Sequence, residues 1–115
     1  MTGLNQRKIN IQDSLIIGVR KNNRKAQLQL YKMYYKAMYN TAFRILKDSA
    51  EAEDVMQEAF LTAFRKIDEY KGDASFGSWL KRIVVNRSID EFKKRKEMVS
   101  IEDAGIQIAA VSYTH

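Results

Sequence analysis

The sequence predicts an all-α fold, a compact bundle of about four helices with a single core. Three observations predict it. The 115 residues include no Pro and only five Gly, so the chain lacks the frequent turns that a strand-rich protein needs. Apolar residues recur every three or four positions over long stretches, which is the spacing of one helix face. A chain of this length is the size of one domain.

The first two helices are predicted from this spacing and from the turn between them. A short helix fits Asp13 to Lys21, with Asp13 as its N-cap, and the turn Lys21-Asn22-Asn23 ends it. From Arg24 to Leu46, one broad apolar stripe predicts a long central helix. The members of this stripe are Leu30, Tyr31, Tyr34, Tyr35, Met38, Ala42, Phe43 and Leu46.

A third, acidic helix, roughly Glu51 to Glu69, is predicted to open with Asp48-Ser49-Ala50-Glu51, in which Asp48 is the cap and Glu51 completes a capping box. Its apolar face runs through four turns and consists of Ala52, Val55, Met56, Ala59, Phe60, Ala63, Phe64 and Ile67. The remaining positions therefore point outward, and they carry Asp54, Gln57, Glu58, Leu61 and Arg65. An acidic face interrupted by a leucine is a candidate contact surface, whereas a solvated helix face is the simpler interpretation of the charges alone.

A fourth helix is predicted from Phe76 to Lys96, after the loop Tyr70 to Ser75. It is basic, because residues 81–96 include seven Lys or Arg and only two acidic residues. One flank places Trp79, Arg82, Asn86 and Lys93 in a row. Cations neutralise phosphates, an amide reads base edges and rings stack on bases, so this flank is a candidate nucleic-acid surface. For Trp79 a core position is the stronger alternative.

The residues argue against an enzyme and against a metal site. The chain has no Cys, its one His is His115, and it has neither a Gly-rich phosphate loop nor a nucleophile elbow. Asp54 and Glu58 are two carboxylates on an open face, too few for a cation site. We therefore expect no catalytic residue, no cofactor and no metal.

The location of the protein is predicted from segments that the sequence lacks. Met1 to Asn10 has no apolar run typical of a signal peptide, and no stretch approaches the ~18 apolar residues that span a bilayer. We therefore expect a cytoplasmic protein with no membrane partner.

Two blocks of the chain together resemble one protein family. The first is Ala52 to Phe60, with the pattern Asp-x-x-Gln-Glu, and the second is Tyr70 to Asp90, a Gly-Asp loop followed by Phe-x-x-Trp-Leu-x-x-Ile. In this order and spacing they resemble region two of the extracytoplasmic-function (ECF) sigma factors of the sigma-70 superfamily. The resemblance covers about Asp13 to Lys96. It implies a domain that docks on RNA polymerase and that recognises and melts the minus-ten promoter element in transcription initiation.

The resemblance also implies a set of residues for each partner. Asp54, Gln57, Glu58 and Leu61 would dock on the clamp helices of the largest subunits of bacterial core RNA polymerase. Promoter DNA, including a base flipped from the non-template strand, would contact Tyr70, Lys71, Gly72, Asp73, Ser75, Phe76, Trp79, Arg82, Asn86, Arg87, Lys93 and Lys94, with Arg95 as a further phosphate contact. Family members are often inhibited by an anti-sigma factor, which would be a third partner.

The expected organisation is a flexible N-terminus over residues 1–12, the helical domain over 13–97 and a linker or tail over 98–115. Complete family members carry a second domain with a helix-turn-helix, and nothing after Gly105 fits it. We therefore expect a fragment of a longer protein, with a minimal family member as the alternative. Two other functions stay open: a helical protein-interaction domain, and a bundle that binds nucleic acid without base preference, which the net charge of +6 and the tyrosines of the central helix favour.

Overall fold

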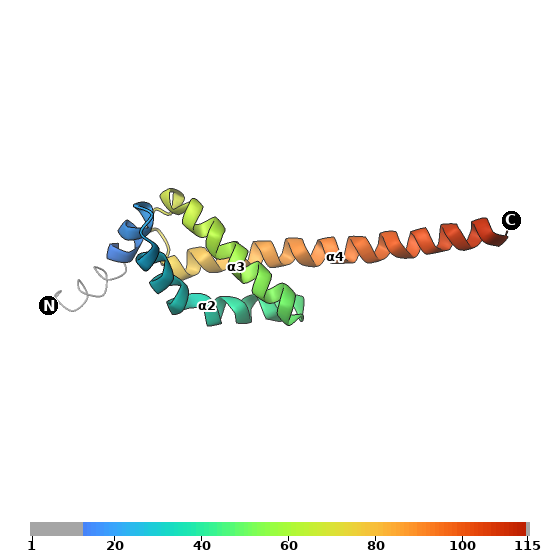
Figure 1. The fold of residues 1–115 in the computed structure, drawn as a ribbon, viewed down its shortest axis with the longest axis horizontal. Coiled ribbons are helices and arrows are strands. Elements are labelled where there is room, and N and C mark those ends of the chain that lie inside the picture. Colours follow the sequence, from blue (N-terminus) through green and yellow to red (C-terminus); the bar gives the residue numbers. More distant parts are fainter. Residues whose placement is uncertain (1–12, 115) are drawn as a thin grey trace.

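The computed structural model describes residues 13–114, and the side chains of residues 13–99. A helical segment over residues 13–20 is followed by α2 (Arg24–Leu46), α3 (Ser49–Arg65), the short 3₁₀ helix η1 (Ile67–Glu69) and α4 (Phe76–Thr114). Every regular element in residues 13–114 is helical, which confirms the all-α prediction. In Figure 1, α2, α3 and the first part of α4 pack together, and the rest of α4 projects as a rod.

Helix α2 has the bounds predicted for it, because local signals at both ends stop the helix. Asn22 adopts a left-handed conformation with φ +59°, which asparagine tolerates better than most residues. The Asn23 side chain then accepts a hydrogen bond from the backbone N–H of Ala26 at 3.1 Å and caps the first turn. At the other end Lys47 is also left-handed, with φ +58°, and its N–H donates to the carbonyl of Phe43 at 2.8 Å.

Helix α3 begins as predicted but ends earlier. The Asp48 carboxylate accepts a hydrogen bond from the backbone N–H of Glu51 at 2.8 Å, so the N-cap is confirmed. The capping box also predicts a hydrogen bond from the backbone N–H of Asp48 to the Glu51 side chain. This bond is not seen, because the Glu51 side chain pairs with Arg95 of α4 instead. The α-helix stops at Arg65, and the chain tightens into η1, which buries Ile67. The predicted continuous helix to Glu69 is therefore wrong in its last turn.

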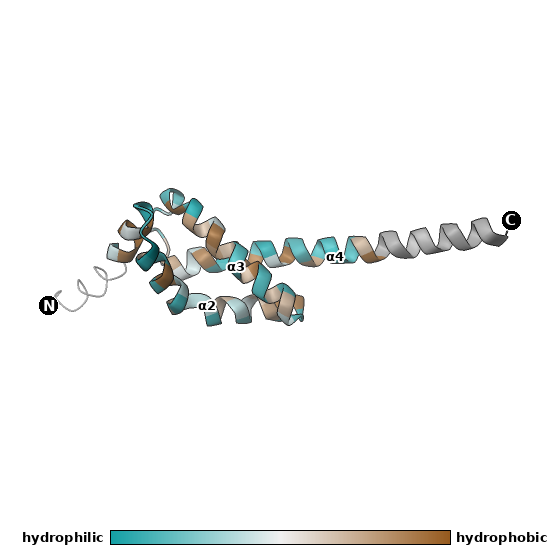
Figure 2. Cartoon of the chain, in the orientation of Figure 1, coloured by the Kyte–Doolittle hydropathy of each residue, from teal (hydrophilic) through white to brown (hydrophobic). Residues whose placement is uncertain are grey.

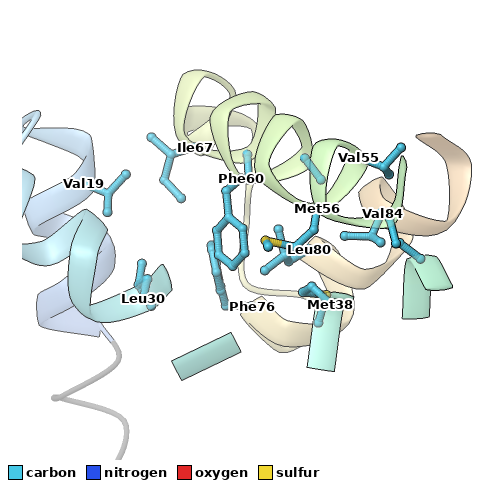
Figure 3. Packing of buried hydrophobic residues seen from close by; sticks show 14 of the residues in the cluster. Val19, Leu30, Met38, Val55, Met56, Phe60, Ile67, Phe76, Leu80 and Val84 are labelled. Atoms are coloured by element: carbon cyan, nitrogen blue, oxygen red, sulfur yellow. The ribbon is translucent and has the colours of Figure 1, made fainter. Parts of the chain in front are cut away.

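The core lies where α2, α3 and the start of α4 meet. The helical segment 13–20 closes one end of it with Val19 (Figure 3). Leu30, Leu46, Leu80 and Val84 are fully buried, and four alanines of α2 and α3 let the helices approach closely: Ala42, Ala52, Ala59 and Ala63. The predicted apolar face of α3 is buried throughout, apart from a half-buried Phe64.

Phe43 is the one member of the α2 stripe that stays exposed. Its exposed fraction is 38%, and its ring stacks on that of Tyr39 with centroids 6.0 Å apart. On a helical wheel Phe43 lies 100° from Ala42, which is fully buried. Phe43 therefore lies outside the side of α2 that faces the core.

Helix α4 continues far beyond its predicted end at Lys96, and its backbone is helical to Thr114. That end was predicted because the apolar periodicity stops there, and periodicity reports packing rather than helix formation. Residues 97–114 contain no Pro and a single Gly, so nothing interrupts the backbone ladder. Figure 2 shows several hydrophilic turns on the middle part of α4. Within the described residues, no helix combines the length and apolar character needed to cross a membrane.

Candidate functional site

The outward side of α3 presents the four residues predicted to contact a protein. Asp54, Gln57, Glu58 and Leu61 are all exposed, and we call them the docking face. Leu61 has an exposed fraction of 60%. The structure therefore confirms the orientation of these side chains, while their partner stays a prediction.

The docking face borders a groove between α2 and α3. The groove has a volume of about 490 Å³ and is lined by Arg24, Gln27, Leu28, Tyr31, Gln57, Phe60, Leu61 and Phe64. Leu28 faces it with an exposed fraction of 52%. Sequence reasoning missed the part of this surface that α2 supplies. The available signal was an apolar residue, Leu28, placed outside the buried stripe of its helix.

Rings of three elements form a cluster under the loop that joins η1 to α4. Phe76 is at its centre, with ring centroids 5.7 Å from Tyr34, 5.8 Å from Tyr70 and 5.8 Å from Trp79. Because Phe76 is fully buried, it supports the loop from below and offers no surface to a nucleic acid. The expected direct contact between Phe76 and DNA is therefore contradicted. Trp79 is only partly buried, with its ring packed on that of Tyr70 at 5.2 Å between centroids, so it belongs to the core and is still partly accessible to solvent.

The loop from Tyr70 to Ser75 is fixed at its ends and exposed in its middle. Tyr70 donates its hydroxyl hydrogen to the carbonyl of Ala74 at 2.7 Å, and Arg20 donates to the carbonyl of Tyr70 at 2.9 Å. Ser75 accepts a hydrogen bond from the N–H of Ser78 at 3.1 Å and so begins α4. Between these anchors, residues 71–73 are exposed, and Gly72 has φ +82°, which favours glycine.

The Tyr70 hydroxyl is protonated at neutral pH, and the fold keeps it protonated further into the alkaline range. Burial raises the pKa of Tyr70 above its ordinary value of 10.0, and the negative charge of Asp13 raises it further. Because the hydroxyl keeps its hydrogen, it remains a donor to the carbonyl of Ala74 and fixes the two ends of the loop to each other. Tyr70 is thus a structural residue of the loop, with its ring between Phe76 and Trp79.

One flank of α4 carries the polar row that the sequence predicts. Arg82, Asn86 and Lys93 are exposed, and Trp79 lies partly exposed at the start of the same flank. We call these four residues the strand face, because they form the candidate surface for a nucleic-acid strand. Lys94 is also exposed, one position further on. The strand face and the docking face lie on different helices of one core, separated by the α3–α4 contact.

Two arginines of α4 point toward α3 instead of lying on the strand face. Arg95 pairs with Glu51 at 3.0 Å and donates to the carbonyl of Leu46 at 2.8 Å, so it ties α4 to the turn between α2 and α3. In the free domain these contacts hold Arg95 against α2 and α3, and its expected phosphate contact stays a prediction. Arg87 donates twice to one carboxylate oxygen of Glu58, through Nη2 at 3.0 Å and Nε at 3.2 Å. The sequence shows neither pair, because the partners are far apart along the chain.

Metal binding finds no support among the side chains that the structure describes. No group of three or more His, Cys, Asp or Glu residues is close enough there to hold an ion. The two surfaces consist of charged side chains, aromatic rings and an exposed loop, which suits binding to macromolecules.

Comparison with known proteins agrees with the residue patterns. Residues 30–98 match the family described as Sigma-70 region 2. The chain is 36% identical over 78 residues to the ECF RNA polymerase sigma factor SigW of Bacillus subtilis (strain 168), covering 68% of this chain and 42% of that protein. It is 38% identical over 72 residues to the ECF RNA polymerase sigma-E factor of Escherichia coli (strain K12), covering 63% of this chain and 37% of that one. The chain thus spans less than half the length of these relatives.

A solved structure shares the fold. It is the NMR structure of the complex between an engineered region 2 of sigmaE and GTAAAA. The two chains superpose with a TM-score of 0.69 and are 29% identical, over 76% of this chain and 90% of the other.

Proposed function

Because this chain belongs to the sigma-70 region 2 family, we propose that it docks on core RNA polymerase and recognises and melts the minus-ten element of promoters, as part of an ECF sigma factor. One observation carries the proposal: a single small core holds an acidic and apolar face on α3 and a cationic, amide-bearing face on α4, with an open loop at the start of α4. Such an arrangement serves two macromolecules at once. We therefore assign the chain to transcription initiation rather than to catalysis.

The docking face and the groove beside it suit an amphipathic helical partner. Leu61 and Leu28 offer apolar contact on the two walls, and Asp54 and Glu58 offer negative charge at the edge. Helices commonly bind such grooves with their apolar side, and charges at the edge select the partner and its orientation. We assign this surface to the clamp helices of the largest polymerase subunits. An anti-sigma factor that inhibits the protein would cover the same face.

The strand face and the loop suit the non-template strand of the minus-ten element. Arg82, Lys93 and Lys94 supply cations for phosphates, Asn86 supplies an amide that can read a base edge, and Trp79 supplies a partly exposed ring. The structural relative binds the sequence GTAAAA, and we extend binding of a similar strand to this chain.

Melting is explained by binding free energy. Taking a base out of the stack costs a few kcal/mol. Contacts that exist only with the exposed strand offset this cost and shift the promoter toward its open form. The exposed middle of the loop, residues 71–73, is our proposed site for the flipped base. The protein acts in the cytoplasm, where the polymerase and the promoter are.

The two binding activities are separable by mutation, and this tests the proposal. We expect Asp54→Ala and Gln57→Ala to weaken binding to core RNA polymerase without changing affinity for a single-stranded minus-ten oligonucleotide. Arg82→Gln and Lys93→Gln should do the reverse. Biolayer interferometry with immobilised polymerase and fluorescence anisotropy with the labelled strand measure the two affinities. Loss of both activities in every variant, at unchanged melting temperature, would contradict the assignment of separate surfaces.

A further inference from the structure

The ion pair between Glu58 and Arg87 joins the two proposed binding surfaces. Glu58 belongs to the docking face of α3, and Arg87 follows Asn86 of the strand face on α4. Both hydrogen bonds of the Arg87 guanidinium to Glu58 end on one carboxylate oxygen, at 3.0 and 3.2 Å. The ion pair therefore neutralises the charge that each of the two side chains would otherwise present to a ligand.

The pair is exposed, and that makes it exchangeable. The exposed fractions of the side chains are 39% for Arg87 and 58% for Glu58. Exposed ion pairs are weak, because water and salt compete with them. Arg95 differs, since it binds both the Glu51 carboxylate and the Leu46 carbonyl and holds the helices together. Arg87 has the single partner Glu58 among the contacts of the described residues, and its release would leave the α3–α4 packing in place.

Arg87 is close enough to contact a DNA strand that runs along α4. It precedes Lys94 by seven residues, which is about two helical turns, so the two side chains leave α4 on the same side. Lys94 is exposed there and points a positive charge outward. A guanidinium freed from Glu58 would add a bidentate phosphate contact beside it, a geometry that arginine favours.

We propose that this ion pair couples the two activities, a proposal that rests on the function given above. In the free domain Glu58 holds Arg87 away from the DNA strand. When a cationic group of the polymerase takes Glu58, Arg87 is released and binds a phosphate of the non-template strand. The coupling is reciprocal, because a strand that takes Arg87 leaves Glu58 free for the polymerase. Each ligand thus removes an obstacle to the other.

The strength of an exposed ion pair sets the size of the effect. The loss of one exposed ion pair corresponds to a change of about two- to fivefold in a binding constant. We therefore expect Glu58→Gln to tighten binding of the isolated domain to a labelled non-template minus-ten oligonucleotide by about two- to fivefold in anisotropy titrations at low salt.

Two controls separate release of Arg87 from the general loss of a negative charge. Glu53→Gln removes another exposed carboxylate of α3, one that contacts Gln57 instead of a cation, and should have a clearly smaller effect. The Glu58→Gln change should have no such effect in a chain that already carries Arg87→Gln. A gain that persists in the double variant, or an equal gain for Glu53→Gln, would overturn the coupling. So would weaker strand binding by Glu58→Gln, because Glu58 would then position Arg87 for the strand.

The polymerase side is tested without DNA. Arg87→Gln should tighten binding of the domain to core RNA polymerase by about two- to fivefold, because it frees Glu58. Lys81→Gln removes an exposed cation from the same helix and should leave this affinity nearly unchanged. Equal effects of the two variants would contradict the proposal.

Failure of the coupling is distinguishable from failure of the proposed function. A wild-type domain that prefers the non-template strand, together with a Glu58→Gln variant of unchanged affinity, would overturn the coupling alone. A wild-type domain without any strand preference would overturn both.

Discussion

Replacing Leu61 with alanine tests the docking face without disturbing the fold. The Leu61 side chain has an exposed fraction of 60% and lines the groove between α2 and α3. Because most of its surface is already in water, its truncation should change the free energy of unfolding by no more than about 0.5 kcal/mol. Any larger effect on polymerase binding would then come from the interface.

The exposed fraction gives the size of that effect. Burying a whole leucine side chain is worth about 1.5–3 kcal/mol. If the partner covers the 60% that is exposed in the free domain, Leu61→Ala should lose about 1–2 kcal/mol of binding free energy. This corresponds to a loss of about 5- to 20-fold in affinity.

Biolayer interferometry of the chain against core RNA polymerase measures this loss, and thermal unfolding by circular dichroism checks the fold. Met33→Ala is a matched control, because Met33 of α2 is an apolar side chain of similar exposure, 54%, outside the groove. It should change affinity less than about twofold. An unchanged affinity for Leu61→Ala, or an equal loss for Met33→Ala, would refute the assignment of the docking face.

Three further changes test other parts of the structure. Asn86→Ala should reduce discrimination between minus-ten and scrambled strands by about 1–3 kcal/mol, measured by anisotropy, and an unchanged preference would exclude Asn86 from base reading. Phe76→Ala empties the centre of the ring cluster and should lower the free energy of unfolding in urea by about 3–5 kcal/mol, whereas a loss below about 1 kcal/mol would mean that the cluster does not support the loop. Tyr70 has a raised pKa, so the unfolded chain releases its proton near the ordinary value of 10.0 and the folded chain only at higher pH. Stability should therefore fall as the pH rises past 10.0, and Tyr70→Phe should show a smaller alkaline loss than the wild type; identical profiles would argue against burial of this hydroxyl.

The sequence was sufficient for the features that local rules determine. Two adjacent asparagines and one apolar stripe predicted α2 with the bounds that are observed, Arg24–Leu46. The spacing of apolar residues on α3 predicted which side is buried and which carries Asp54 and Leu61. These features depend on contacts within one helix or one turn, and helical periodicity encodes them directly.

The remaining features depend on contacts between distant residues, which periodicity does not encode. Arg87 was predicted on the DNA-binding surface, and Glu58, 29 residues away, holds it against α3. Arg95 pairs across 49 residues with the end of α2. In the same way, the Leu28 wall of the groove exists only because α2 lies beside α3. The end of α4 was placed too early because that stretch of helix has no apolar stripe to mark it.

Strand selection by the isolated chain distinguishes recognition of bases from binding by charge alone. Labelled non-template, template and scrambled minus-ten oligonucleotides are titrated with the chain at two salt concentrations, and fluorescence anisotropy gives the three affinities. We predict that the chain prefers the non-template strand at both salt concentrations, because Asn86 and the loop would contact bases as well as phosphates. Equal binding to all three strands with a steep salt dependence would contradict it, and would leave a basic helical domain without base recognition.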